Sequence, residues 1–338
     1  MAYQRNGTIQ VADYNDLIGA TNSTTAETLN AIWGVGNGST GYGQTAINQI
    51  STTGITRVLP AQWNSVINTM NAINNHQGST IVPISLNNQG DLIVARMTTA
   101  TTPQSQFKAN FVTLNANRLN TAAQGATLTA QTTRTTTWTN ALTFTHTITF
   151  ASGNAARYFF NAGGQIAINF SHPSGNFVND LWNKLAFACG TIVISAQNTS
   201  NTINVAGNPY RGVERIVDGG SAISNLPVAT LATTRGYYGL TNTNIEIFKM
   251  LAYTGQAGYL SSFISVSART NGTQTSNGDN GSTITITTVW DEIPNGGGTV
   301  KGTASANSRT TCTARLPAET YLTNTWGTPT IAGAVTGS

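Results

Sequence analysis

The chain has 338 residues, of which 39% are hydrophobic and only 8% are charged, whereas roughly 25% of residues are charged in an average globular protein. Its 11 Phe, 10 Tyr and 6 Trp exclude a disordered chain, and its net charge of +4 comes from scattered basic residues, which argues against nucleic acid as a partner. No run approaches the roughly 20 apolar residues needed to cross a bilayer, so we expect no membrane insertion.

Residues 1–80 differ from the rest of the chain and are predicted to form a helical module for attachment or oligomerisation. The segment from Thr24 to Glu27 has the pattern of a capping box and predicts a short helix that ends at Gly34. The glycine-rich stretch 34–43 lacks the preceding strand and the Gly-Lys-Ser/Thr ending of a phosphate-binding loop. We therefore interpret it as a flexible loop.

The best predicted helix runs from Ala61 to His76, between Pro60 and Gly78. One face of this helix carries the apolar residues Trp63, Val66, Ile67 and Met70. An isolated helix of this length is marginal in water, so we expect this apolar stripe to be an assembly interface with another subunit or a partner protein.

Residues 81–130 are predicted to be a transition between two modules. A short strand is expected at 81–84, and a linker helix at 106–121. Beyond about residue 130 the pattern becomes that of β-structure.

Residues 131–338 are predicted to form a β-sandwich-like module. The clearest strand is 142–150, in which threonines at alternate positions face one side and mostly apolar residues face the other. Further strands are predicted at 157–170, 191–195, 201–206, 260–268 and 282–290, with a helix at 176–188. The Asn-Gly-rich segment 270–281 predicts a long hairpin loop, and the tail after Trp326 is interpreted as an edge strand or an extended arm. The fold class is therefore mainly β, with a small helical N-terminal module before an antiparallel β-sandwich-like module.

Cys189 and Cys312 are the only cysteines, and such a low count fits assembly in a reducing cytoplasm. Cys189 lies in an apolar run and is expected to be a buried free thiol. A disulfide between the two stays open.

The groups with catalytic or metal-binding chemistry do not form a recognisable site. None of His76, His146 and His172 has the spacing of metal ligands. The adjacent acids Asp291 and Glu292 point to opposite faces of a strand, which does not suit glycoside hydrolysis. We predict a non-enzymatic protein without catalytic residues, metal or cofactor, although acids brought together by folding would leave a glycosidase open.

Tyrosines in loop-rich surroundings are the best candidates for ligand recognition. Tyr237 and Tyr238 lie between two glycines, and aromatic rings near Asn and Gln suit the stacking and hydrogen bonding of sugars. The alternative is that these tyrosines line the sandwich or a subunit interface. The Asn-Gly-rich loop 270–281 is a second candidate for recognition, or only a solvated hairpin tip.

Three segments resemble structural proteins of tailed bacteriophages, closest to those of myoviruses of marine bacteria and cyanobacteria. They are Arg157-Tyr-Phe-Phe-Asn-Ala-Gly-Gly-Gln-Ile, Gly236-Tyr-Tyr-Gly-Leu-Thr, and the helix from Trp63 to Gly78. The resemblance implies a virion component assembled in the host cytoplasm, and a homotrimeric tail fibre at the baseplate or neck is the first choice. Its partners would be other virion proteins, with host-surface glycan as a further ligand. The alternatives are a collar, baseplate or capsid-decoration protein, a tailspike-type depolymerase, and a lectin-like binding protein.

Overall fold

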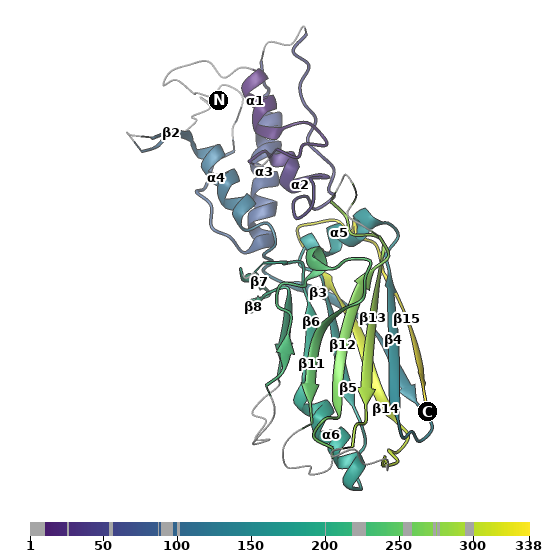
Figure 1. The fold of residues 1–338 in the computed structure, drawn as a ribbon. Coiled ribbons are helices and arrows are strands. Elements are labelled where there is room, and N and C mark those ends of the chain that lie inside the picture. The colour runs from purple at the N-terminus through teal and green to yellow at the C-terminus, as the bar shows by residue number, and fades with distance from the viewer. Residues whose placement is uncertain are drawn as a thin grey trace.

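The computed structural model describes residues 11–25, 27–53, 57–86, 88, 97–99, 102–199, 201–217, 228–252, 259–272, 275, 278–294 and 301–338. Figure 1 shows a helical bundle at one end of the molecule and a β-sandwich at the other, with α5 (Gly153–Asn161) between them. The predicted fold class, mainly antiparallel β preceded by a few N-terminal helices, is confirmed.

The bundle is built from elements that precede the sandwich in the chain. They are α1 (Val11–Ile18), α2 (Leu29–Trp33), α3 (Pro60–Gln77), α4 (Gln106–Ala116) and the ribbon β1 (Met97–Thr99) with β2 (Thr102–Ser105). The predicted helix 61–76 is α3. Proline opens it without the loss of a hydrogen bond, and Gly78 ends it in the left-handed region with φ 64°.

The apolar stripe of α3 is buried inside the chain. Trp63, Val66, Ile67 and Met70 are each at most 1% exposed, and the Trp63 ring packs against Tyr14 of α1 and Phe107 of α4. Other helices of the same chain thus supply the cover that we expected from a second subunit. The assembly role predicted for these four residues has no exposed surface through which to act.

Two local predictions in this region are wrong. The capping box at Thr24–Glu27 does not form, because α2 starts only at Leu29 and Glu27 is left-handed at φ 69°. The segment 81–84 pairs with no strand; instead the side chain of Asn110 accepts from the Val82 N–H and donates to the Val82 carbonyl. An amide side chain thereby replaces the backbone partner that a strand would need.

The sandwich consists of two antiparallel sheets. The six-stranded sheet has the order β10 (Thr230–Leu231), β11 (Ile245–Leu251), β12 (Phe263–Thr270), β13 (Thr283–Asp291), β4 (Ala141–Thr149) and β15 (Thr330–Gly337). The five-stranded sheet has the order β3 (Gln124–Arg134), β14 (Ser308–Pro317), β5 (Gln165–Ser171), β6 (Thr191–Ile194) and β9 (Val213–Ile216). A small ribbon of β7 (Ile203–Val205) and β8 (Asn208–Tyr210) lies near the bundle. The predicted transition segment 81–130 is thus divided between the two parts of the molecule. It contains α4, which belongs to the bundle, and most of the length of β3, which belongs to the sandwich.

The threonine alternation predicted for 142–150 is confirmed, and β13 repeats it from Thr283 to Thr287. Leu142, Phe144, His146 and Ile148 of β4 are fully buried, while the threonines between them face outward. β13 lies beside β4 in register, so Thr145 faces Thr287 and Thr147 faces Thr285 across the strands. The outer face of this sheet is therefore rich in threonine over these two strands, with Val289 and Asp291 as the exceptions on β13. The predicted hairpin of β12 with β13 and the predicted edge strand β15 also form.

The strand predicted at 157–170 is wrong in its first half. Residues Gly153–Asn161 form α5, whose N-terminus is capped by the Ser152 side chain accepting from the Ala155 N–H. Only Gln165–Ser171 is a strand. The aromatic run at 158–160 has strand propensity, but the cap and the burial of one helix face decide the outcome.

Helix α6 (Phe177–Cys189), which corresponds to the helix predicted at 176–188, lies at the end of the sandwich far from the bundle (Figure 1). Its Trp182 ring packs between Trp138 and Trp290, with ring centroids 5.0 and 5.6 Å away. Cys189 and Cys312 are both buried and free. The open question of a disulfide is therefore settled in favour of two thiols, and burial raises the pKa of each.

Candidate functional site

The glycine-rich loop 34–43 joins the bundle to the sandwich and is held in place by Arg157 of α5. This side chain is 0% exposed, and its guanidinium donates to the carbonyl oxygens of Val35, Gly38 and Thr40 at 2.7 to 3.3 Å. Gly41 has φ +90°, and a Cβ there would lie 2.3 Å from the Val35 oxygen, so only glycine fits. The prediction of a flexible loop is wrong. The loop turns its carbonyls towards a cation, which is the reverse of a phosphate-binding loop.

Further side chains bind the same loop from the sandwich. Asn161 donates to the carbonyls of Gly38, Thr40 and Gly41. The Tyr238 hydroxyl lies 2.7 Å from both the Gly38 carbonyl oxygen and the Asn161 side-chain oxygen, and its single proton serves these two acceptors. Beyond the loop, the Gln44 side chain donates to the Thr323 carbonyl and accepts from its N–H, both at 2.9 Å. The junction is therefore a continuous hydrogen-bonded network rather than a linker.

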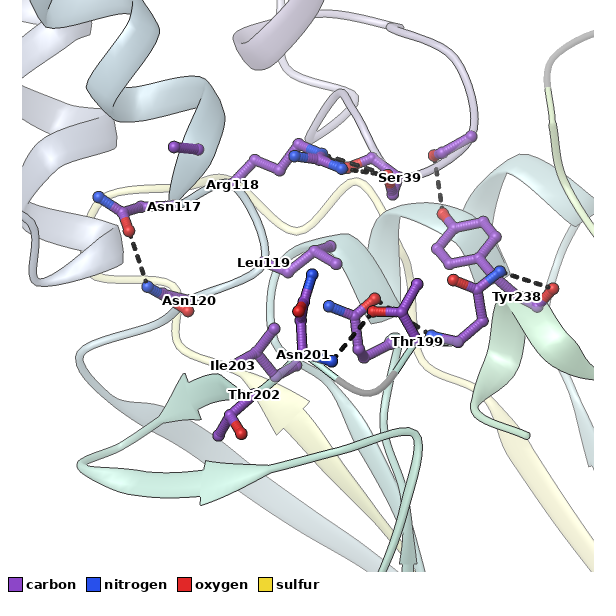
Figure 2. Close-up of a pocket in the computed structure, with 14 residues that line it drawn as sticks. Ser39, Asn117, Arg118, Leu119, Asn120, Thr199, Asn201, Thr202, Ile203 and Tyr238 are labelled. Carbon is purple, nitrogen blue, oxygen red and sulfur yellow. Dashed lines mark hydrogen bonds between the residues drawn. The ribbon is translucent and has the colours of Figure 1, made fainter. Parts of the chain in front are cut away.

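A polar cleft of about 550 Å³ lies beside this junction (Figure 2). It is lined by the tip of the glycine-rich loop, the turn after α4, the segment between β6 and β7, and Tyr238 from the 3-10 helix η1 (Tyr237–Gly239). Figure 2 shows Arg118 and Ser39 along one side, Tyr238 along another, and Thr199 and Asn201 between them. The described lining residues are Gly38, Ser39, Ala116, Asn117, Arg118, Leu119, Asn120, Gln197, Asn198, Thr199, Asn201, Thr202, Ile203 and Tyr238.

The lining of this cleft is polar and rich in amides. It has no carboxylate among its described residues, and Arg118 is its one cation there. The guanidinium of Arg118 is already engaged by the Ser39 hydroxyl and carbonyl and by the Asn115 carbonyl. In contrast, the side-chain amide of Asn201 bonds to no protein group within the described residues and is available to a ligand.

Tyr238 is a wall of this cleft and not a reactive group. Burial, reinforced by the neighbouring Tyr237, holds the pKa of the Tyr238 hydroxyl well above its usual range, although Arg157 opposes the shift. The phenol therefore stays protonated near neutral pH and acts as a hydrogen-bond donor. The arrangement can bind a polar ligand, and among its described lining residues there is no carboxylate or histidine.

The two tyrosines that were predicted to recognise ligand are placed differently. Tyr238 is half-buried and reaches the cleft, whereas Tyr237 is 0% exposed and stacks on Phe160 with ring centroids 4.3 Å apart. The Tyr237 hydroxyl accepts from the Asn280 N–H. Tyr237 is thus a packing residue, as the alternative interpretation had it.

The predicted recognition loop 270–281 is also turned towards the bundle. In its described part, Asp279 and Asn280 are buried, and the Asn280 amide donates to the carbonyls of Tyr237 and Leu240. Asp279 and Asn280 therefore do not face solvent, whereas Asn271 and Thr275 of the same loop are exposed.

Most of the cleft residues could not be recognised from the sequence. Asn117, Asn120, Gln197 and Asn201 come from two segments about 80 positions apart, and the Asn120 side chain bridges them by accepting from the Asn204 N–H 84 positions later. In a chain rich in Asn and Thr these amides form no periodic pattern. Only the polar run 197–202 between two strands could have marked one side of the cleft.

Other reactive groups lie apart from the cleft. Glu292, the residue after β13, is fully buried. Its carboxylate accepts from the Gly302 N–H, and burial raises its pKa. Within the described residues, no three His, Cys, Asp or Glu side chains are grouped as a metal would require. In the same residues, no helix is long and apolar enough to span a membrane.

Comparisons with protein-family models, with curated proteins and with solved structures find no match to this chain.

Proposed function

We propose that this chain is a non-enzymatic structural component of a tailed-phage particle, with a tail fibre attached at the baseplate or neck as the first choice. The resemblance at residues 63–78, 157–166 and 236–241 motivates the proposal, and the threonine-rich outer face of β4 and β13 is consistent with a surface that packs in an assembly. A collar, baseplate or capsid-decoration protein is the nearest alternative, and it differs only in position on the particle.

The observation that carries this proposal is the hydrogen-bonded junction. Arg157, Asn161 and Gln44 fix the helical end to the β end through bonds between segments more than 100 positions apart. A virion component that attaches by one end and presents the other needs such a fixed connection, whereas independent domains are commonly joined by flexible linkers.

Mass spectrometry of gradient-purified particles tests the proposal. The protein should remain with the particles after nuclease treatment and high-salt washing, in a fixed ratio to the major capsid protein. Labelled antibody should then place it on the tail or neck by electron microscopy. Its absence from washed particles would overturn the proposal.

We further propose that the cleft binds a neutral glycan of the host surface. Amide and hydroxyl groups around a half-buried tyrosine suit sugar hydroxyls. The described lining has no carboxylate, and the Arg118 guanidinium already donates to Ser39 and Asn115, so most of the donors and acceptors left for a ligand are neutral. A depolymerase would need two acids near the bound sugar, and the described lining has none.

Glycan-array screening followed by calorimetry tests this second proposal. Asn201→Ala should weaken binding of a neutral glycan by about 2- to 10-fold, the worth of one hydrogen bond. Asn208→Ala is the matched control, because Asn208 is also an exposed amide but lies outside the cleft. Equal affinities of the two variants, or binding to charged glycans alone, would refute the assignment.

A further inference from the structure

The outer edge of β15 is an open sheet edge without the usual protection. Within the described residues β15 pairs with β4 on one side and with no strand on the other, as Figure 1 also shows. Its sequence Thr-Ile-Ala-Gly-Ala-Val-Thr-Gly has no charge and no proline, and its pairing with β4 has no bulge. Natural proteins normally block such edges with one of these features, because an open edge pairs with another strand.

The backbone groups that face this open edge follow from the pairing of β4. The Phe150 N–H donates to Ser282, and the Glu292 N–H donates to Asn140. Even-numbered residues of β4 therefore bond to β13, and odd-numbered ones bond to β15. The register then turns the odd-numbered residues of β15, Ile331, Gly333 and Val335, towards the open edge with their N–H and C=O groups.

The strand is a palindrome about Gly333. Reading outward in both directions gives Ala332 and Ala334, then Ile331 and Val335, then Thr330 and Thr336. If two copies of β15 pair antiparallel with Gly333 opposite Gly333, every residue meets its own kind or, for Ile331 and Val335, a β-branched neighbour of similar shape. The pairs that exchange backbone hydrogen bonds are then those whose groups face the edge.

Apolar side chains at this edge are incompletely covered by the chain itself. Ile331 and Val335 of β15 and Leu128 of β3 point into the sandwich but are only partly buried. β3 is the edge strand of the other sheet and packs against β15. A second copy on β15 would extend the sheet and bring more cover to these three side chains.

We propose that two copies of this chain associate through β15, antiparallel and about a two-fold axis at Gly333, so that the two six-stranded sheets become one continuous sheet. The occupant is a second copy because a two-fold interface requires a surface complementary to itself, and the palindrome meets that requirement. The inference goes beyond the proposed function and differs from the homotrimer expected from the resemblance. A three-fold axis cannot pair β15 with its own copy.

Charge-swapped variants test the pairing. Ala332 and Ala334 are exposed on the outer face, and each would lie opposite the other in the partner copy. Ala332→Lys/Ala334→Lys and Ala332→Glu/Ala334→Glu each place like charges across the axis, which destabilises the pair. By light scattering coupled to size exclusion, the unaltered protein should be a dimer, and each variant alone should shift to a monomer. An equal mixture of the two variants should recover a dimer containing one copy of each.

Two features keep this experiment decisive. Gly333 is left unchanged, because a Cβ there would lie 2.0 Å from the Thr132 hydroxyl of the same chain and would disturb the fold. Thr287→Lys/Val289→Lys is the matched control, with the same charges and spacing on the outer face of β13, away from the edge and opposite the uncharged Ser267 and Ser265 of β12. This control should stay dimeric. A monomeric or trimeric unaltered protein, lysine variants that remain dimeric, or a mixture that stays monomeric would overturn the proposal.

Discussion

Replacement of Arg157 by methionine or lysine measures how the junction is held together. In the folded chain the guanidinium is fully buried without a carboxylate partner among the described residues, and its partners are the carbonyls of loop 34–43 and the Asn154 side chain. If Arg157 is removed, the carbonyls of Gly38 and Thr40 keep the amide of Asn161 as a donor. The Val35 carbonyl and the Asn154 oxygen lose theirs.

An acceptor left without a donor costs about 1–3 kcal/mol when it is buried. Val35 and Asn154 are both half-buried, so we take the lower part of that range for each. The sum is partly offset because a charge no longer has to be desolvated, and we expect a loss of about 1–3 kcal/mol for Arg157→Met. Arg157→Lys keeps the charge but has one nitrogen in place of a planar fork. One ammonium cannot serve Val35, Thr40 and Asn154 together, so we expect a loss of about 3–5 kcal/mol.

Urea unfolding followed by tryptophan fluorescence gives these losses, and hydrogen exchange of the amides in loop 34–43 shows whether the loop loosens. Arg309→Met is the control, since Arg309 is half-exposed on β14 and its loss should change stability by no more than about 0.5 kcal/mol. A lysine variant as stable as the unaltered protein would refute the reasoning, because a point charge would then suffice.

Three further predictions concern pH, the bundle and chemistry. Burial lowers the pKa of His76 and of His146 to about 4, so the unfolded chain takes up these protons at higher pH than the folded chain does. The contribution of these two histidines to the free energy of unfolding should be fully present above about pH 6.5 and be lost as the pH falls from about 6.5 to 4. His146→Gln should make the urea-unfolding midpoint depend less steeply on pH over this range. Val66→Asp should cost more than about 4 kcal/mol, because it buries an unpaired carboxylate in a fully covered position; circular dichroism should show lost helix in this variant even without any partner. Purified protein should release no reducing ends from host lipopolysaccharide or capsule, and a release that Glu292→Ala abolishes would contradict this.

The parts of the fold that sequence could predict are those set by local periodicity. The threonine alternation identified β4 and β13, and the apolar spacing of Trp63, Val66 and Met70 identified α3. Periodicity says which face of an element is buried, but not what covers it. The stripe of α3 was therefore assigned to a subunit interface, although α1 and α4 cover it.

The candidate site could not be predicted because its geometry depends on contacts distant in sequence. In the sequence Arg157 stands at the start of a predicted strand. Its role as a hydrogen-bond donor to loop 34–43 depends on the packing of that loop against α5. Asn201 and Asn117 are ordinary polar residues until β7 and the turn after α4 are neighbours. Tertiary contacts, which outweigh local propensity, decide both cases.

The strand order also determines how long an early strand must wait for its partner during synthesis. The first long strand of the sandwich, β3, pairs only with β14, and Thr129 bonds to Thr313 184 positions later. A ribosome adding ~5–20 residues per second would need about 10–35 s to deliver that partner. During this interval the emerging β3 does not yet have its partner strand, and its edge, charged only at Arg134, is open to other nascent chains. Production of this protein should therefore gain from slow translation or from chaperones that shield early strands, and fragments that end before β14 should aggregate.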